Sequence, residues 1–217
     1  MKYKVVKVDI NSRYYPVRLK NIDSPPKELY CCGNLKLLNY ASNIAIIGSR
    51  DCSCYGERAA KDFAFNLARE GVCIISGLAK GIDSFAHIGA LNAKGKTIAV
   101  LGSGLDNIYP RENIKLAESI IKNDGLLVSE YPLGSLPLKQ HFPARNRILC
   151  GLSDSVLVIE AKRKSGTNIT VDFALEQGKD VFVVPGNIYS KTSDGTNFLI
   201  MEGAIPVLNY KDLLKTI

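Results

Sequence analysis

The feature that most constrains the fold is a repeated alternation between Asn43 and Val207: a short apolar run, a glycine-containing turn, then an amphipathic stretch. Short continuous apolar runs are typical of strands buried on both faces, and apolar residues at helical spacing are typical of helices that cover them. We therefore expect an α/β protein of extended Rossmann-like type, with a mostly parallel sheet and helices on both faces. The predicted strands span residues 44–47, 72–76, 97–101, 126–129, 155–159, 180–184 and 205–207, and the predicted helices span 56–70, 83–93, 112–122, 143–152 and 168–177.

Residues 1–42 have a different character. An alternating strand is predicted from Lys2 to Ile10, a turn at Pro25-Pro26, and a second apolar run from Leu29 to Gly33. We expect a short N-terminal β appendage, residues 1–42, that packs on a main Rossmann-like domain at residues 43–217. The appendage holds eight lysines and arginines against three acids, whereas the main domain holds 20 against 18. Because the main domain is nearly neutral, an anion site there requires a few locally placed cations.

The composition favours a cytoplasmic protein without membrane contact. No apolar run approaches the roughly 20 residues that a membrane span needs, and the start MKYKVVKVDI lacks the apolar core of a signal peptide. The six cysteines lack the C-x-x-C spacing of a zinc site. We interpret them as small apolar residues in a reducing compartment.

Three turns follow predicted strands at the sheet edge where open α/β sheets bind ligands. They are Gly48-Ser49-Arg50, the segment Gly77 to Gly81 with Lys80 in it, and Ser165-Gly166. Glycine lets the backbone approach a ligand, and free N–H groups at a helix start attract phosphate. Each turn alone is equally compatible with a plain chain reversal. Together they predict phosphate binding by Gly48, Ser49, Arg50, Gly77, Lys80, Gly81, Ser165 and Gly166.

The stretch from Lys139 to Arg147 combines three cations with an aromatic ring, and no acid lies between Pro132 and Ser153. A phenylalanine can stack on a base, which is worth about 1–3 kcal/mol in single-strand binding proteins, and the cations can neutralise phosphates. The alternative is that the ring packs in the core and that the arginines bind helix carbonyls or acids. We predict single-stranded DNA as the ligand, with contacts from Lys139, Phe142, Arg145, Asn146 and Arg147.

Residue patterns for several other chemistries are missing. There is no G-x-G-x-x-G with a downstream acid for a dinucleotide and no G-x-x-x-x-G-K-[ST] for ATP hydrolysis. Glu160 and Asp172 could form an acid pair, but neither a metal cluster nor a nucleophile accompanies them. His87 and His141 have no serine or cysteine partner at a telling spacing. We therefore predict no catalytic residue, no metal and no cofactor.

A set of motifs that covers almost the whole chain is specific in combination. The motifs are Ser24-Pro25-Pro26, Ile47-Gly48-Ser49-Arg50, Ser76 to Asp83, Thr97 to Gly102, Tyr109-Pro110, Ser129 to Pro132, Phe142 to Ile148, Val158 to Ala161, Ser165-Gly166, Pro185-Gly186 and Gly195-Thr196-Asn197. They resemble the DprA/Smf family of DNA-processing proteins of bacterial natural transformation. The resemblance implies a homodimer that binds single-stranded DNA without sequence preference, delivers it to RecA recombinase and catalyses no reaction. It also implies DNA contacts from Arg50, Lys139 and Phe142, with the Gly48, Ser165 and Gly166 backbone lining the same pocket.

The sequence departs from the family's pattern in two places. Members often carry a helical domain before this region and a winged-helix domain after it, and we expect neither here. The family also tends to have an apolar residue at the position of Asn168, and this change alters the pocket wall.

Two other functions on a similar fold are alternatives. Phosphoribohydrolases carry Pro-Gly-Gly-x-Gly-Thr-x-x-Glu, and the nearest segments here are Ser165-Gly166-Thr167 and Pro185-Gly186-Asn187, without the full run or its glutamate. The other alternative is a sensor of a small nucleotide messenger.

Overall fold

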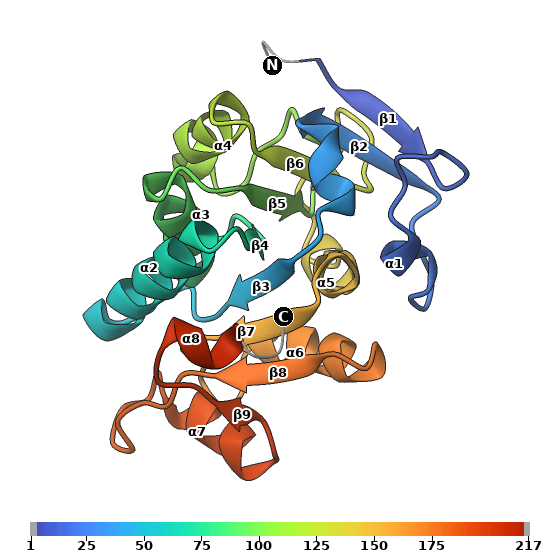
Figure 1. The fold of residues 1–217 in the computed structure, drawn as a ribbon. Helices are drawn as coiled ribbons and strands as arrows, with labels where there is room; N and C mark the ends of the chain where they lie inside the picture. The colour runs from blue at the N-terminus through green and yellow to red at the C-terminus, as the bar shows by residue number, and fades with distance from the viewer. Residues whose placement is uncertain (1–3, 215–217) are drawn as a thin grey trace.

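The computed structural model describes residues 4–214, which form one nine-stranded sheet with helices on both of its faces (Figure 1). The strand order is β1-β2-β6-β5-β4-β3-β7-β8-β9. The strands are β1 (Val6–Asp9), β2 (Glu28–Gly33), β3 (Asn43–Ile47), β4 (Cys73–Ser76), β5 (Thr97–Leu101), β6 (Leu126–Ser129), β7 (Ser155–Val158), β8 (Asp180–Val183) and β9 (Ile205–Pro206). The helices are α1 (Val17–Lys20), α2 (Cys54–Arg69), α3 (Ile82–Asn92), α4 (Ile114–Lys122), α5 (His141–Leu152), α6 (Gly166–Glu176), α7 (Asp194–Met201) and α8 (Tyr210–Leu213), with 3-10 turns η1 (Leu35–Asn39) and η2 (Arg111–Asn113).

The seven strands from β6 to β9 pair in parallel, and β1 and β2 pair antiparallel at one edge. This arrangement confirms the predicted fold class. The chain starts its parallel part at β3 and adds β4, β5 and β6 on one side, then β7, β8 and β9 on the other. The turns that follow β3, β4, β5 and β7 therefore meet at one edge, which we call the carboxyl edge.

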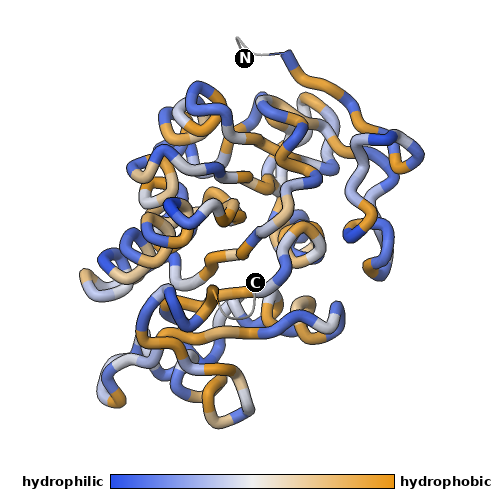
Figure 2. The backbone as a smooth tube through the Cα atoms, in the orientation of Figure 1, coloured by the Kyte–Doolittle hydropathy of each residue, from blue (hydrophilic) through white to orange (hydrophobic). Residues whose placement is uncertain are grey.

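The central strands are buried on both faces because their apolar side chains alternate between two helical layers. Ile44 and Ile46 of β3 pack with α2 and α3, whereas Ala45 and Ile47 pack on the opposite face with residues of α5 and α6. Figure 2 shows the resulting hydrophobic colouring along the strands. The predicted apolar face of α2 is buried as expected, and the Ser53 hydroxyl accepts from the Gly56 N–H to cap this helix.

The N-terminal segment extends the main sheet. β2 pairs with β6, and β1 pairs with β2. Leu19 and Ile22 pack into the same core cluster as the strands, and the Tyr15 hydroxyl donates to the Pro26 carbonyl at 2.7 Å. The boundary that we predict between residues 42 and 43 stays a prediction.

The predicted element bounds differ from the structure by small amounts. β5 matches its prediction, whereas α5 begins at His141 and α6 at Gly166, two residues before the predicted starts. Pro143 fits α5 because it lies in the first turn, where a backbone N–H is not needed. The sequence prediction omitted α1, α7 and α8, which are too short for a helical period to stand out. The start of the first predicted strand, Lys2, lies outside the described residues. None of the helices within residues 4–214 is long and apolar enough to cross a membrane.

Candidate nucleic-acid interface

The turns after β3 and β4 pack directly on each other at the carboxyl edge. Gly81 has φ +80°, and a side chain there would lie 2.4 Å from the Ser49 carbonyl oxygen. A side chain at Gly48 would lie 2.8 Å from the Glu160 carbonyl oxygen, which accepts from the Ser49 N–H. The Ile82 N–H in turn donates to the Ser49 carbonyl. The close approach of three loops therefore requires glycine at positions 48 and 81. The Ser49 and Ile82 N–H groups at this edge already have protein acceptors.

A pocket of about 330 Å³ opens beside these turns. It brings together five of the residues that the sequence predicted to bind phosphate or DNA: Arg50, Gly77, Lys80, Phe142 and Arg145. Arg50 and Lys80 are exposed, so their charges face solvent at the mouth. The remaining lining residues are Asp51, Ala79, Tyr109, Pro110 and Glu112.

Two aromatic rings form one wall of the pocket. The ring centroids of Tyr109 and Phe142 lie 5.5 Å apart with 47° between their planes. The Arg50 guanidinium carbon lies 5.8 Å from the centre of the Phe142 ring. Phe142 is half-buried and Tyr109 is 49% exposed. The wall therefore offers accessible ring surface next to a cation, which suits a base and its phosphate.

Arg145 forms the floor of the pocket and is only 4% exposed. Its guanidinium donates to the Val100 carbonyl and lies so close to Gly77 that a side chain there would come within 2.3 Å. Burial lowers the pKa of Arg145 to about 10. Arg145 is therefore a positioned, largely desolvated cation.

The buried carboxylate of Asp83 organises the turn after β4. It accepts hydrogen bonds from the Gly77 and Ala79 N–H groups at 3.1 and 3.4 Å. Burial raises its pKa, and the nearby Arg145 charge and these hydrogen bonds oppose that effect. The turn is thus fixed by the buried Asp83 carboxylate, a residue that the sequence predicted only as the first of a helix.

Arg147 points to a different part of the molecule. Its guanidinium donates to both carboxylate oxygens of Glu130, at 2.7 and 2.6 Å, and to the Ser24 carbonyl at 3.0 Å. The hydrogen bond to Glu130 raises the pKa of Arg147 further. The alternative that this arginine binds an acid thus describes its contacts in the structure, and a DNA contact from Arg147 stays a prediction.

The other eight predicted residues do not line the pocket. Lys139 is exposed on the loop before α5, and Asn146 is half-buried on that helix. Ser165 and Gly166 start α6, at the end of the loop that follows β7. The structure therefore groups five of the thirteen predicted residues in one pocket and spreads the others along the same edge or beneath it.

Tyr109 lines the pocket but was not among the site residues predicted from the sequence. Its only signal was the Tyr109-Pro110 motif of the resemblance. Glu160, considered above as one of an acid pair, makes structural hydrogen bonds. Its carboxylate accepts from the Ser53 N–H at 2.8 Å, the Ser53 hydroxyl at 2.6 Å and the Thr192 hydroxyl at 2.9 Å. Glu160 therefore joins three loops, and within residues 4–214 no cluster of side chains suited to a metal is present.

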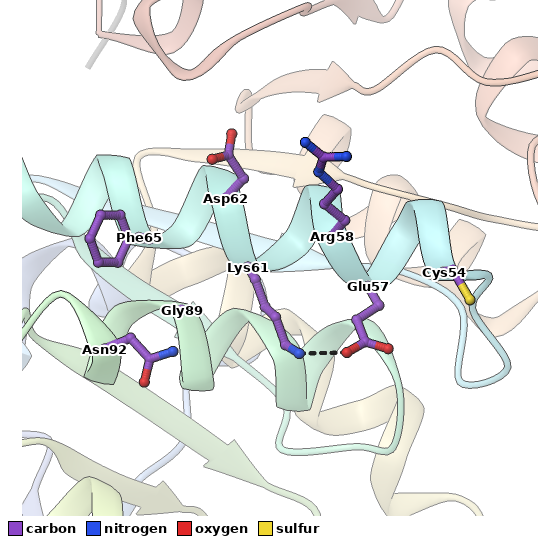
Figure 3. Close-up of a pocket in the computed structure, with 8 residues that line it drawn as sticks. All are labelled: Cys54, Glu57, Arg58, Lys61, Asp62, Phe65, Gly89 and Asn92. Atoms are coloured by element: carbon purple, nitrogen blue, oxygen red, sulfur yellow. Dashed lines mark hydrogen bonds and ion pairs between the residues drawn. The ribbon is translucent and has the colours of Figure 1, made fainter.

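A larger groove of about 630 Å³ runs along α2 and α3, and none of the predicted site residues lines it. Figure 3 shows that it is bordered by mixed charges, with the Lys61 ammonium paired to the Glu57 carboxylate. Its two basic and two acidic side chains balance in charge. None of its lining residues has a buried side-chain nitrogen or oxygen without a hydrogen-bond partner. The smaller pocket at the carboxyl edge therefore remains the candidate site. The other residues along the groove are Cys54, Arg58, Asp62, Phe65, Gly89 and Asn92.

Comparison with known proteins decides the family. The family model described as DNA recombination-mediator protein A matches residues 7–217. The chain belongs to this family. The DNA processing protein DprA of Bacillus subtilis is 41% identical over 208 residues, which cover 96% of this chain and 70% of the relative.

Two solved DprA structures share the fold along nearly the whole chain. The DprA of Streptococcus pneumoniae superposes with a TM-score of 0.92 at 45% identity, covering 99% of this chain and 74% of that one. The DprA of Helicobacter pylori superposes with a TM-score of 0.88 at 35% identity, covering 99% and 96%. The description of the latter refers to its single-stranded DNA binding mode. The family and fold predictions are thus confirmed.

Proposed function

We propose that this DprA-family chain binds single-stranded DNA without sequence preference in the cytoplasm and delivers it to RecA recombinase during DNA uptake. The observation that carries the proposal is the pocket in which Arg50 and Lys80 stand beside the accessible Tyr109 and Phe142 rings. The description of the Helicobacter pylori relative as a single-strand binder supports it.

The chemistry of the pocket favours a single strand over a duplex. Every base has a π face that can stack on a ring, so stacking is tolerant of sequence, but a base inside a duplex is already stacked on its neighbours. Arg50 and Lys80 supply phosphate contacts at the mouth, with Lys139 further along the edge. Arg145 adds a buried positive charge beneath the pocket, with one of its N–H groups bound to the Val100 carbonyl.

The test is the affinity of purified variants for a fluorescent thymine oligonucleotide at two salt concentrations. Arg50→Ala and Phe142→Ala should each weaken binding about tenfold, within the range expected for one stacked base or one phosphate contact. Lys36→Ala is the matched control, because Lys36 lies in η1 at the opposite edge of the sheet. If Arg50→Ala, Lys139→Ala and Phe142→Ala all bind as tightly as the parent protein, the proposed function is wrong.

We also propose that the chain acts by binding and not by catalysis. The carboxylate of Glu160, which could have served in hydrolysis, is engaged by Ser53 and Thr192. Incubation with nucleoside monophosphates should release no free base. Release of base would instead favour a phosphoribohydrolase, and a nucleotide that co-purifies with the protein would favour a messenger sensor.

The homodimer is part of the same proposal. Four large apolar side chains between β8 and α8 are at least 77% exposed, and a second copy of the chain could cover them. They are Ile188, Tyr189, Met201 and Leu208. Light scattering should give twice the chain mass, and Met201→Glu should shift the measured mass towards that of the monomer.

Delivery to RecA is tested by the rate at which RecA forms filaments on DNA strands coated by single-strand binding protein.

A further inference from the structure

Three consecutive cations, Lys162, Arg163 and Lys164, form the loop between β7 and α6. All three are exposed, and none takes part in an ion pair within residues 4–214. None belongs to the residues predicted to bind DNA, although Ser165 and Gly166 follow directly. We call residues 162–164 the basic loop.

Asn168 holds the basic loop in one conformation. Its side-chain amide donates to the Arg163 carbonyl at 2.8 Å, and its backbone N–H donates to the Ser165 carbonyl at 3.2 Å. A short polar side chain is required for the first bond, and an apolar residue could not make it.

Helix α7 supports the basic loop from the other side. The Arg163 guanidinium carbon lies 4.1 Å from the centre of the Phe198 ring. The Gly195 N–H donates to the Ala161 carbonyl, and a side chain at Gly195 would come within 2.6 Å of the Lys162 carbonyl oxygen. With its backbone held at both ends, the loop presents its charges at a lower entropy cost than a mobile chain would.

The basic loop follows a turn that lies next to the turn carrying Arg50. β3 and β7 are neighbouring parallel strands, with Ile47 opposite Val158. The Ser49 N–H donates to the Glu160 carbonyl at 2.8 Å, so the turn that carries Arg50 and the turn that leads to Lys162 run side by side. Neighbouring strands are separated by about 4.8 Å. A single DNA strand that extends from Arg50 along the carboxyl edge therefore reaches the basic loop next.

We infer that the basic loop is a second phosphate-binding segment, which holds the backbone of the same single strand beyond the nucleotides bound at the pocket. This inference rests on the proposed function, because it needs a strand already anchored near Arg50. Lys162 and Lys164 bind phosphates, and Asn168 is the positioning residue. Arg163 contributes charge while its guanidinium stacks on Phe198.

The test is a double variant, Lys162→Ala with Lys164→Ala, assayed on thymine oligonucleotides of increasing length. The shortest oligonucleotide that binds should show unchanged affinity, and longer ones should bind about tenfold more weakly than to the parent protein. The plot of log affinity against log salt should lose about 1.4 from its slope on the long oligonucleotide, at about 0.7 for each lost single-strand phosphate contact. The double variant Lys162→Arg with Lys164→Arg keeps both charges and should bind like the parent.

Two further variants separate this inference from the proposed function. Asn168→Ala leaves all charges in place and should weaken long oligonucleotides about threefold, because the loop loses its fixed conformation. Lys36→Ala with Lys122→Ala removes two charges far from the carboxyl edge and should change neither affinity nor slope. If Arg50→Ala weakens binding while the basic-loop double variant leaves both affinity and slope unchanged, the inference is wrong and the proposed function stands. If Arg50→Ala and Phe142→Ala also have no effect, the proposed function fails with it.

Discussion

The stretch from Lys139 to Arg147 and the basic loop at residues 162–164 each contain three cations, but their charges have different environments. In the first, Arg145 is buried beneath the pocket and Arg147 is paired with Glu130, so Lys139 alone is exposed. In the basic loop all three cations are exposed, and Asn168 fixes the backbone. The stretch from Lys139 to Arg147 thus offers a ligand fewer exposed, unpaired charges than the basic loop, which was not among the predicted site residues.

The comparison shows that charge along the sequence is a weak guide to charge at a surface. A cation on a helix that packs against a sheet meets the carbonyls and acids of other strands, and it is desolvated or paired there. A cation on a loop at the sheet edge stays in water. The two kinds of cation should therefore differ in what their removal does to stability.

The largest effect should come from Arg145→Ala. It removes a buried side chain, leaves the Val100 carbonyl without this donor and takes a countercharge away from buried Asp83. We expect the free energy of unfolding to fall by about 3–5 kcal/mol. Urea denaturation followed by circular dichroism measures this, with Lys164→Ala as the exposed control. A loss no larger than that of the control would mean that Arg145 is not part of the core.

The next effect concerns pH and His87, which is buried next to the same charge. Burial, aided by Arg145, lowers the pKa of His87 from 6.5 to about 3. The unfolded chain therefore binds a proton below pH 6.5 that the native protein does not bind, so stability should fall as the pH falls. Between about pH 6.5 and pH 4 the free energy of unfolding should drop about 3 kcal/mol more in the parent than in His87→Gln. Parallel pH profiles for the two proteins would contradict this.

A smaller effect is expected for Arg147→Ala. The bidentate pair with Glu130 is mostly buried, with side-chain exposures of 15% and 17%, and Arg147 also holds the Ser24 carbonyl. We expect a loss of about 1–3 kcal/mol in thermal or urea unfolding. A double-mutant cycle with Glu130→Gln isolates the pair. On the folded variant, affinity for single-stranded DNA should fall less than for Arg50→Ala, and an equal fall would assign Arg147 to the DNA site.

The smallest effect on stability should come from Lys162→Ala with Lys164→Ala. These exposed side chains make no ion pair within residues 4–214, so the free energy of unfolding should change by less than about 0.5 kcal/mol. Urea denaturation under the conditions used for Arg145→Ala provides the direct comparison. A loss above about 1 kcal/mol would show that the basic loop is structural.

Local patterns predicted the layers of the fold because each pattern is written in neighbouring residues. The apolar face of α2 and the bounds of β5 follow from period and turn residues alone. The short helices α1 and α7 were missed, since one or two turns are stabilised by packing rather than by their own sequence. The site was predicted in part: Arg50 and Phe142 do meet, but Tyr109 joins them through folding across the edge of the sheet.

An α/β sheet and the edge at which its glycine turns lie could be predicted from the sequence, because strand and helix periods and glycine positions are local properties. Which cations remain available at that edge depends on contacts between distant segments. Glu130 lies 17 residues before Arg147, and Ser24 lies 123 residues before it. Whether a charge is paired, buried or exposed depends on such distant partners. For that reason the glycine turns could be placed from the sequence, while the free charges of Lys162 and Lys164 could not.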